Sequence, residues 1–277
     1  MPVITMTREL GSRGKDVALA LADELGLAIV HRELVEHQLA KRLDVGESAV
    51  HRYLEGKPSM FERLGLDRTD LSFCTAAEIF DLAAQGNVLI RGWGATHLLR
   101  AIPHIVGVRV CAPIDVRVKT LMERLGWDDV RRALNAIREN DAAHARTMHR
   151  LFDINWEDPL LYDLVLNTAR VSIKDSADLI KYLVSQPTFE ETAESHAKLV
   201  TLKVEAKIRS ALRCNPITRN TGPSFGISLD PTTRKVTLTG AVAKDQFRHE
   251  VEQVVLAVPG VTQVDNQLVA TAHYPPG

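Results

Sequence analysis

The chain has 277 residues, of which 45% are hydrophobic and 25% are charged, an ordinary balance for a globular protein of one large or two smaller domains. Its formal net charge of -1 argues against broad electrostatic binding to nucleic acid. The sequence has neither a signal-peptide pattern nor an apolar run of about 18 residues, so we expect a soluble cytoplasmic protein.

The first 186 residues alternate short apolar runs with helical patterns. We expect strands at 3–6, 27–30, 87–90, 105–110 and 164–166. We expect helices at 15–25, 33–43, 48–54, 69–84, 115–125, 128–152 and 174–185. Short apolar strands separated by helices predict an α/β fold with a parallel sheet covered on both faces. Ligands of such sheets bind at the carboxyl ends of the strands.

A glycine-containing loop follows the first strand at such an end. The segment TRELGSRGKD at 7–16 brings together Gly11, Ser12, Arg13, Gly14, Lys15 and Asp16. Glycines let backbone N–H groups turn toward an anion, and the start of the next helix adds positive potential. A complete Walker A motif reads G-x-x-x-x-G-K-[ST], but Glu9 replaces its first glycine and Asp16 its Ser or Thr. The pattern alone leaves two readings open, a phosphate-binding loop and a helix start that carries Gly and Lys.

The chain divides near residue 187. Residues 187–197 are polar, carry three acids and no Lys or Arg, and are predicted to be a linker. Residues 1–186 have a net charge of -2, whereas residues 198–277 carry 10 basic and 6 acidic groups, a net charge of +4. This bias indicates either a solvated surface or a basic binding face.

The last part is predicted to be a small α+β domain. Helices are expected at 199–212 and 244–258, and strands at 225–229, 235–242 and 261–269. Val236, Leu238 and Val242 alternate with polar residues, so they are expected to share the buried face of a sheet.

The spacing of the cysteines and histidines supports neither a metal site nor a disulfide bond. Cys74, Cys111 and Cys214 are far apart and match no zinc, redox or disulfide pattern. His144 and His149 are five residues apart, which does not place them on one helix face, and we expect no resident metal site built from these residues.

Five segments of the first part resemble the cytidylate kinase-like family, a branch of the P-loop nucleoside monophosphate kinases. They are ITMTRELGSRGKDVA at 4–18, HRELV at 31–35, VLIRGWGA at 88–95, APIDVRVKTLMER at 112–124 and DINWEDPLLYDLVLNTAR at 153–170. The family's loop usually reads R-x-x-G-S-x-G-[RK], so the imperfect Walker A motif is typical of this branch. The resemblance covers residues 4–186 and implies ATP with Mg²⁺ and a nucleotide acceptor.

The resemblance also implies roles for individual residues. Residues 11–16 would bind phosphate, and Lys15, Arg117 and Arg124 would be catalytic. Asp16 would hold magnesium through water, or simply favour the helix start. Arg32 would face the acceptor, with a surface ion pair as the ordinary alternative, and Arg91 would face it in place of the family arginine that Trp93 replaces. The donor base would lie against Arg117, Asn167 and Thr168, although Asn-Thr is also common turn chemistry.

The segment 128–152 occupies the position of the family's lid. Arginines on a mobile lid would close over the phosphates and exclude water. Five arginines are available there: Arg131, Arg132, Arg138, Arg146 and Arg150.

Three positions depart from the family pattern. His31 replaces the acid of D-R-E, Trp93 the arginine of G-R-G-A, and His144 the lid arginine. Losing one preorganised charged contact typically costs about 10²- to 10³-fold in rate. Two hypotheses therefore stand, an ATP-dependent nucleoside monophosphate kinase and a catalytically degenerate nucleotide sensor.

The last part resembles a BON domain over residues 199–270. The similarity rests on KVTLTGAV at 235–242 and VPGVTQVDNQLV at 258–269. It implies a phospholipid or protein partner for residues 198–277, and self-association stays open.

Overall fold

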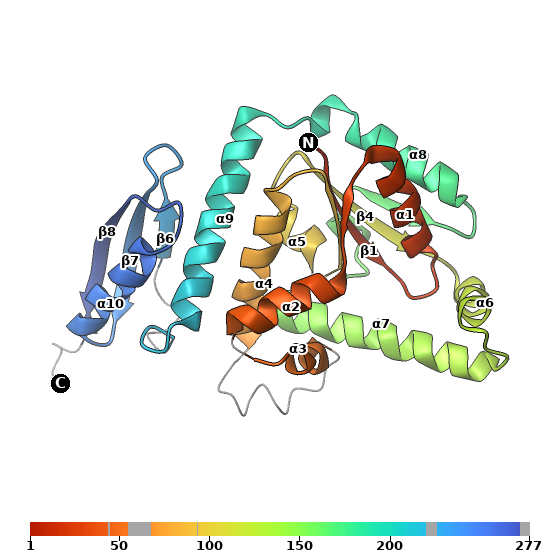
Figure 1. Ribbon diagram of the computed structural model, residues 1–277, viewed down its shortest axis with the longest axis horizontal. Helices are drawn as coiled ribbons and strands as arrows, with labels where there is room; N and C mark the ends of the chain where they lie inside the picture. Colours follow the sequence, from red (N-terminus) through yellow and green to blue (C-terminus); the bar gives the residue numbers. More distant parts are fainter. Residues whose placement is uncertain (44, 55–67, 93, 220–225, 272–277) are drawn as a thin grey trace.

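In the computed structural model, a five-stranded sheet forms the centre of the larger part of the molecule (Figure 1). The structure describes residues 1–43, 45–54, 68–92, 94–219 and 226–271, without the side chains of 32–34, 53–54 and 68–69. The strand order is β2-β3-β1-β4-β5, and every neighbouring pair is parallel. The strands are β1 (Val3–Arg8), β2 (Ala28–Val30), β3 (Val88–Arg91), β4 (Ile105–Cys111) and β5 (Leu164–Asn167).

Helices cover both faces of this sheet, which confirms the predicted α/β class. Ile4 and Met6 of β1 pack with α1 (Gly14–Leu25) and α8 (Ile173–Val184) in one apolar core. Val3 of β1 faces the second core. The helices that contribute to that core or extend it are α2 (Arg32–Leu43), α3 (Glu47–Leu54), α4 (Arg68–Ala83), α5 (Ala95–Leu99) and α7 (Val130–Phe152).

The remaining elements of the larger part lie at its periphery. Helix α6 (Ile114–Leu125) packs on α7 through Val118, Leu121 and Ile137. Two short 3-10 turns cover Pro159–Leu161 and Pro187–Phe189. Predicted and observed helix boundaries in this part agree within two residues, but the short α5 was not predicted.

The small part is a three-stranded sheet of order β6-β7-β8. Its strands are β6 (Gly226–Leu229), β7 (Lys235–Val242) and β8 (Gln263–Ala270), and α10 (Asp245–Leu256) connects the parallel pair β7 and β8. Val236, Leu238 and Val242 are buried on one face, as their alternation predicted.

Helix α9 (Ala193–Cys214) is shared between the two parts. It stands between α4 and the small sheet (Figure 1). Leu199 and Ala206 pack in the core of the larger part, whereas Val204, Ile208 and Leu212 pack in the core of the small sheet. The helix begins six residues before the predicted start at 199, so it includes residues 193–197 of the predicted linker. One continuous helix therefore contributes to both cores.

Basic residues of α9 pair with carboxylates of α4. Asp81 accepts ion pairs from Lys203 at 3.1 Å and Lys207 at 2.8 Å. Asp70, which is 1% exposed, pairs with Arg213 at 2.6 Å. Much of the positive bias of the C-terminal segment is thus matched by acids of the larger part.

The first turn of α9 and the chain just before it are also attached to the larger part. The N-terminal ammonium of Met1 donates to Glu191 at 3.1 Å. His196 contacts the same carboxylate at 2.7 Å, and His104 contacts Ser195 at 2.8 Å. The pKa of Glu191 is lowered, mainly by its hydrogen bond with His196 and further by the charge of the N-terminus.

The loop between β1 and α1 depends on an unusual backbone position at Gly11. Its φ is +83°, and a Cβ there would lie 2.5 Å from the carbonyl oxygen of Arg117. Gly126, which ends α6 at a φ of +63°, would place a Cβ in open space. Both positions favour glycine by conformation, but only Gly11 also needs it for close approach.

We predict that α9 makes the two parts unfold together. Leu199→Ala and Ile208→Ala each remove a fully buried side chain, from different cores, and should each lower the free energy of unfolding by about 2–5 kcal/mol. Urea unfolding followed by circular dichroism should give a single transition that both variants shift. Leu256→Ala, at a position 39% exposed, is the control and should change stability by less than about 0.5 kcal/mol. Two separate transitions, each moved by only one core variant, would contradict the shared helix.

A second prediction separates backbone conformation from steric fit. Gly126→Ala should cost about 1–2 kcal/mol because only the left-handed backbone opposes it. Gly11→Ala should cost clearly more, because its methyl group would also collide with the α6 backbone. Denaturant titration of both variants tests this, and equal losses would show that the loop relaxes away from Arg117.

Candidate functional site

The loop at 9–16 has the geometry of an anion cradle. Ser12 N–H donates to the Glu9 carbonyl at 3.2 Å, and Asp16 N–H to the Arg13 carbonyl at 2.8 Å. Within the described part of the chain, the N–H groups of Gly11, Arg13, Gly14 and Lys15 donate to no protein acceptor. Arg13 adopts a left-handed conformation immediately before α1. Unpaired N–H groups at a helix start form a site that anions fill.

Lys15 is exposed on the first turn of α1, and among the described residues no carboxylate pairs with it. Asp16, its neighbour, is different because it accepts from Arg124 at 2.7 Å and from Arg13 at 3.3 Å. Lys15 is therefore available to an external anion, whereas Asp16 holds two arginines near the loop.

Positive side chains gather around this cradle. The pKa of Arg8 is lowered by burial and by the nearby charges of Arg91 and Arg124, with only a partial offset from Asp16. Arg91 Nη2 donates to His31 Nδ1 at 2.9 Å, because a guanidinium has only donors. Repulsion among these arginines would be relieved by a bound anion.

A network of ion pairs connects the start of the cradle to β4 and α6. The Glu9 carboxylate accepts from Arg109 at 2.9 Å and from the Ala112 N–H at 3.2 Å, and it lies 3.5 Å from Arg117. Arg117 in turn donates to the Leu10 carbonyl at 2.8 Å. Glu9, which replaces a glycine in the Walker pattern, thereby joins β1, β4 and α6.

Arg117 also attaches α7 to the loop. Its guanidinium donates to both oxygens of Asp141, at 2.8 and 2.7 Å, and Arg117 is only 6% exposed. Burial raises the pKa of Asp141, and the contact with Arg117 opposes that shift. In this arrangement Arg117 positions the loop and the predicted lid.

The end of β5 lies against the other side of the loop. Thr168 Oγ1 donates to the Ser12 carbonyl at 2.7 Å. Asn167 is exposed, and its Oδ1 accepts from the Ala169 N–H at 3.0 Å. The structure therefore brings Asn167 and Thr168 to the cradle, although they are more than 150 residues away in sequence.

Other predicted residues are not among the described contacts of the cradle, or lie outside the residues that the structure describes. The backbone of Arg32 begins α2, but its side chain is not among those described, and Trp93 lies outside the described residues. His144 packs edge-on against Trp156, with ring centroids 4.5 Å apart. Of the predicted lid arginines, Arg132 stacks on Trp127 at 4.1 Å. Arg131, Arg138 and Arg146 are exposed and Arg150 is partly buried.

Sequence reasoning missed the supporting network of Glu9, Arg109 and Asp141. One signal was present, since Arg109 interrupts an otherwise apolar strand and a buried arginine requires partners. The partners themselves lie 24 and 100 or more residues apart, so spacing does not indicate them.

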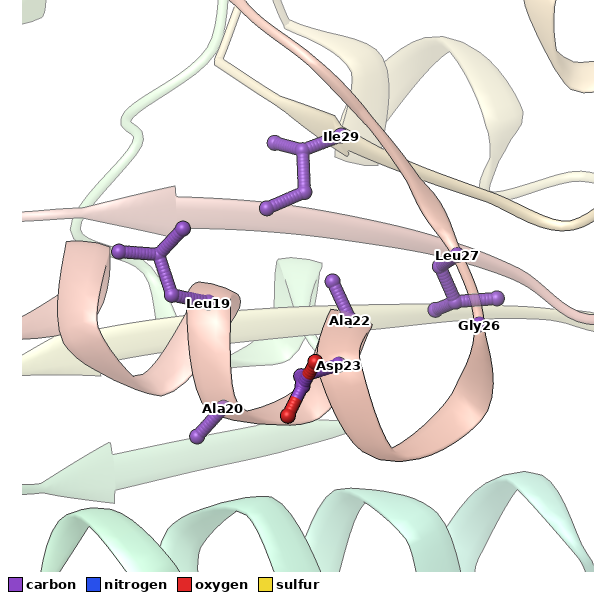
Figure 2. A pocket seen from close by; sticks show the side chains of 7 residues that line it. All are labelled: Leu19, Ala20, Ala22, Asp23, Gly26, Leu27 and Ile29. Atoms are coloured by element: carbon purple, nitrogen blue, oxygen red, sulfur yellow. The ribbon is translucent and has the colours of Figure 1, made fainter.

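A separate groove lies on the far part of α1, away from the cradle. Figure 2 shows Leu19, Ala22, Asp23, Leu27 and Ile29 around it. Asp23 is its only charged side chain among the described residues, so this groove lacks the converging polar groups of a specific ligand site.

Two kinds of feature are absent from the described residues. No group of three His, Cys, Asp or Glu side chains is arranged to hold a metal ion there. None of the helices described combines the length and hydrophobicity needed to span a bilayer.

Comparison with known proteins agrees with this architecture. A cytidylate kinase from Methanococcus aeolicus is 23% identical over 180 residues, which cover 64% of this chain and 94% of that protein. A cytidylate kinase from Pyrobaculum islandicum is 25% identical over 177 residues, covering 64% and 89%. The crystal structure of an uncharacterized protein from Eubacterium ventriosum matches with a TM-score of 0.52 at 23% identity, over 67% of this chain and all of that one, which supports the fold alone.

Two family models match separate parts of the chain. The BON domain model matches residues 202–272, beginning within α9. The model of the cytidylate kinase-like family matches residues 3–170, which include the cradle, the ionic network and the end of β5. The chain therefore belongs to the cytidylate kinase-like family and carries a BON domain at its C-terminal end.

Proposed function

We propose that this protein is a phosphotransferase that moves the γ-phosphoryl group of ATP to a nucleoside monophosphate, with a cytidylate-type acceptor as the first candidate. The observation that carries the proposal is the cradle, where several N–H groups and Lys15 have no protein partner among the described residues, and where Arg8 interacts electrostatically with Arg91 and Arg124. Phosphoryl transfer depends mainly on positioning and on neutralising charge, and these groups supply both.

Each predicted residue receives a role in this proposal. Residues 11–15 hold the phosphates, and Lys15 and Arg124 neutralise charge on the transferred group. Arg91 is the last residue of β3, Arg32 follows β2, and both would face the acceptor. Asn167 and Thr168 border the donor base.

Arg117 has a conditional role. Its guanidinium donates to the Leu10 carbonyl and to Asp141, and Arg117 is only 6% exposed, so a donor base reaches the face of the guanidinium only if a covering element moves. Because Asp141 lies on α7, we infer that movement of this lid and base binding are coupled.

The residues also fit a magnesium ion that accompanies ATP. Mg²⁺ is commonly bound by one or two carboxylates together with substrate phosphates. Each oxygen of Asp16 accepts from one arginine and retains a second lone pair, so Asp16 is able to hold the ion through water. When bound, the ion supplies neutralisation of phosphate charge.

A nucleotide sensor is the second candidate. It is favoured by His31, which occupies a donor of Arg91, and by His144, which packs on Trp156 in the position of a lid arginine. In this reading the cradle binds the nucleotide without efficient transfer.

We predict that Lys15→Ala lowers transfer of labelled phosphate from Mg-ATP to CMP by about 10²- to 10³-fold, because it removes an organised charge from the transition state. UMP, AMP, GMP and dCMP complete the acceptor panel. Lys119→Ala, at an exposed helix position in α6, is the matched control and should keep wild-type turnover. Absence of transfer by folded wild-type protein, with nucleotide binding that Lys15→Ala weakens, would reject the kinase and favour the sensor.

For the BON domain we propose that the basic residues of α9 do not serve as a docking patch for an anionic lipid surface. Lys203, Lys207 and Arg213 pair with Asp81 and Asp70 of the larger part, so these charges do not form an open basic patch. On the open face of the sheet, Lys235 pairs with Asp265 at 3.0 Å.

We therefore expect the full chain to stay in the supernatant when sedimented with phosphatidylserine vesicles at physiological salt. Asp81→Asn, which removes the charge that pairs with Lys203 and Lys207, is the informative comparison. A gain of vesicle binding in this variant would show that the two lysines bind lipid once they are released from Asp81. Pelleting of the wild-type chain that disappears at high salt would contradict this assignment.

A further inference from the structure

Two cysteines meet where α4 contacts the shared helix α9. The sulfur atoms of Cys74 and Cys214 are 3.4 Å apart, although the residues are 140 positions apart in sequence. Ser210 Oγ donates to the Cys74 sulfur at 3.3 Å. A disulfide bond is about 2.05 Å long, so joining these sulfurs requires an approach of little more than about 1 Å.

The two thiols differ in access and in acidity. Cys74 is fully buried, whereas Cys214, the last residue of α9, is partly exposed. The hydrogen bond from Cys74 lowers the pKa of Cys214 to about 7, against the effect of burial, and Ser210 and Arg42 add to the lowering while Asp70 opposes it. The contact with Cys214, together with burial, raises the pKa of Cys74. Because the thiolate is the nucleophile, Cys214 is the thiol that reacts first.

We propose that Cys74 and Cys214 form a modification site, a dithiol that a low-molecular-weight disulfide converts into an intrachain disulfide between α4 and α9. The proposal does not depend on the phosphotransferase activity, since neither cysteine belongs to the cradle. Cys111 is a natural comparison within the same chain, because its sulfur donates to the Leu166 carbonyl and pairs with no described cysteine.

The reaction consists of two exchanges. The Cys214 thiolate attacks one sulfur of the oxidant RSSR, which breaks its S–S bond, forms a Cys214–S–S–R mixed disulfide and releases RS⁻. Cys74 then loses its proton to solvent and attacks the Cys214 sulfur, which releases a second RS⁻. Two protein thiols are oxidised, one RSSR is reduced to two thiols, and the two thiol protons balance the two RS⁻.

The product would fix the shared helix to the larger part. The disulfide would close a loop of about 140 residues, for which constraint of the unfolded chain predicts a rise in melting temperature of roughly 5–10 °C. It would also hold the BON domain in its observed position on α4 during local opening of the contact.

The test uses the full chain, equilibrated with oxidised and reduced glutathione at set ratios, quenched with acid and digested for mass spectrometry. We expect a crosslinked peptide pair containing residues 74 and 214 in the wild type and in Cys111→Ser. Cys214→Ser should give no crosslink, and Cys74→Ser should stop at glutathione attached to Cys214. Persistence of both thiols under oxidised glutathione, while the urea-unfolded chain reacts, would overturn the proposal, as would a crosslink that involves Cys111.

A second measurement keeps the proposal testable if a variant folds poorly. The rate of iodoacetamide labelling of Cys214 in the wild type should be half-maximal near pH 7. In Cys74→Ala, which removes the hydrogen-bond donor, the midpoint should move toward the ordinary value of about 8.5. Equal midpoints in both proteins would show that Cys74 does not activate Cys214.

Discussion

The Glu9 carboxylate, partly buried between two arginines, is the constraint on which the candidate site depends. It compensates Arg109 and Arg117, whose side chains are 9% and 7% exposed. Leaving either guanidinium uncompensated in this setting would be strongly unfavourable, so the network holds β1, β4 and α6 in one arrangement. Arg117 extends the same arrangement to the Leu10 carbonyl and to Asp141. The ion pairs of Glu9 with Arg109 and Arg117 therefore hold in place the backbone that carries the N–H groups of the cradle.

Most of the fold could be predicted from the sequence, because apolar periodicity determines which faces of its elements are buried. Val3, Val88 and Ile105 occupy short apolar runs and became parallel, buried strands in register. Helix α5 escaped prediction because it has only five residues and starts after a left-handed Gly94. The start of α9 escaped because its first turn is polar, and its cap uses Ser195 rather than the Glu or Gln of the usual capping box.

The candidate site was readable only in part. Lys15 came from the loop motif, whereas Asn167 and Thr168 came from the resemblance to the kinase family, and the structure brings all three to the cradle. The ion-pair partner of Arg117, Asp141, could not be predicted, because ion pairs join residues that are adjacent only after folding. The positive bias of residues 198–277 was misleading for the same reason, since composition does not reveal that Asp81 and Asp70 face those charges.

The continuity of α9 has a mechanical consequence. A helix of 22 residues extends about 33 Å and bends little, so it behaves as a stiff arm. One side of this arm rests on α4, which precedes β3 and Arg91, and the other side carries the BON sheet. A tilt of α4 would therefore swing the small sheet as a rigid body, with displacement increasing with distance along the arm. At the boundary between the two family matches such a helix would transmit motion, whereas a flexible linker would absorb it.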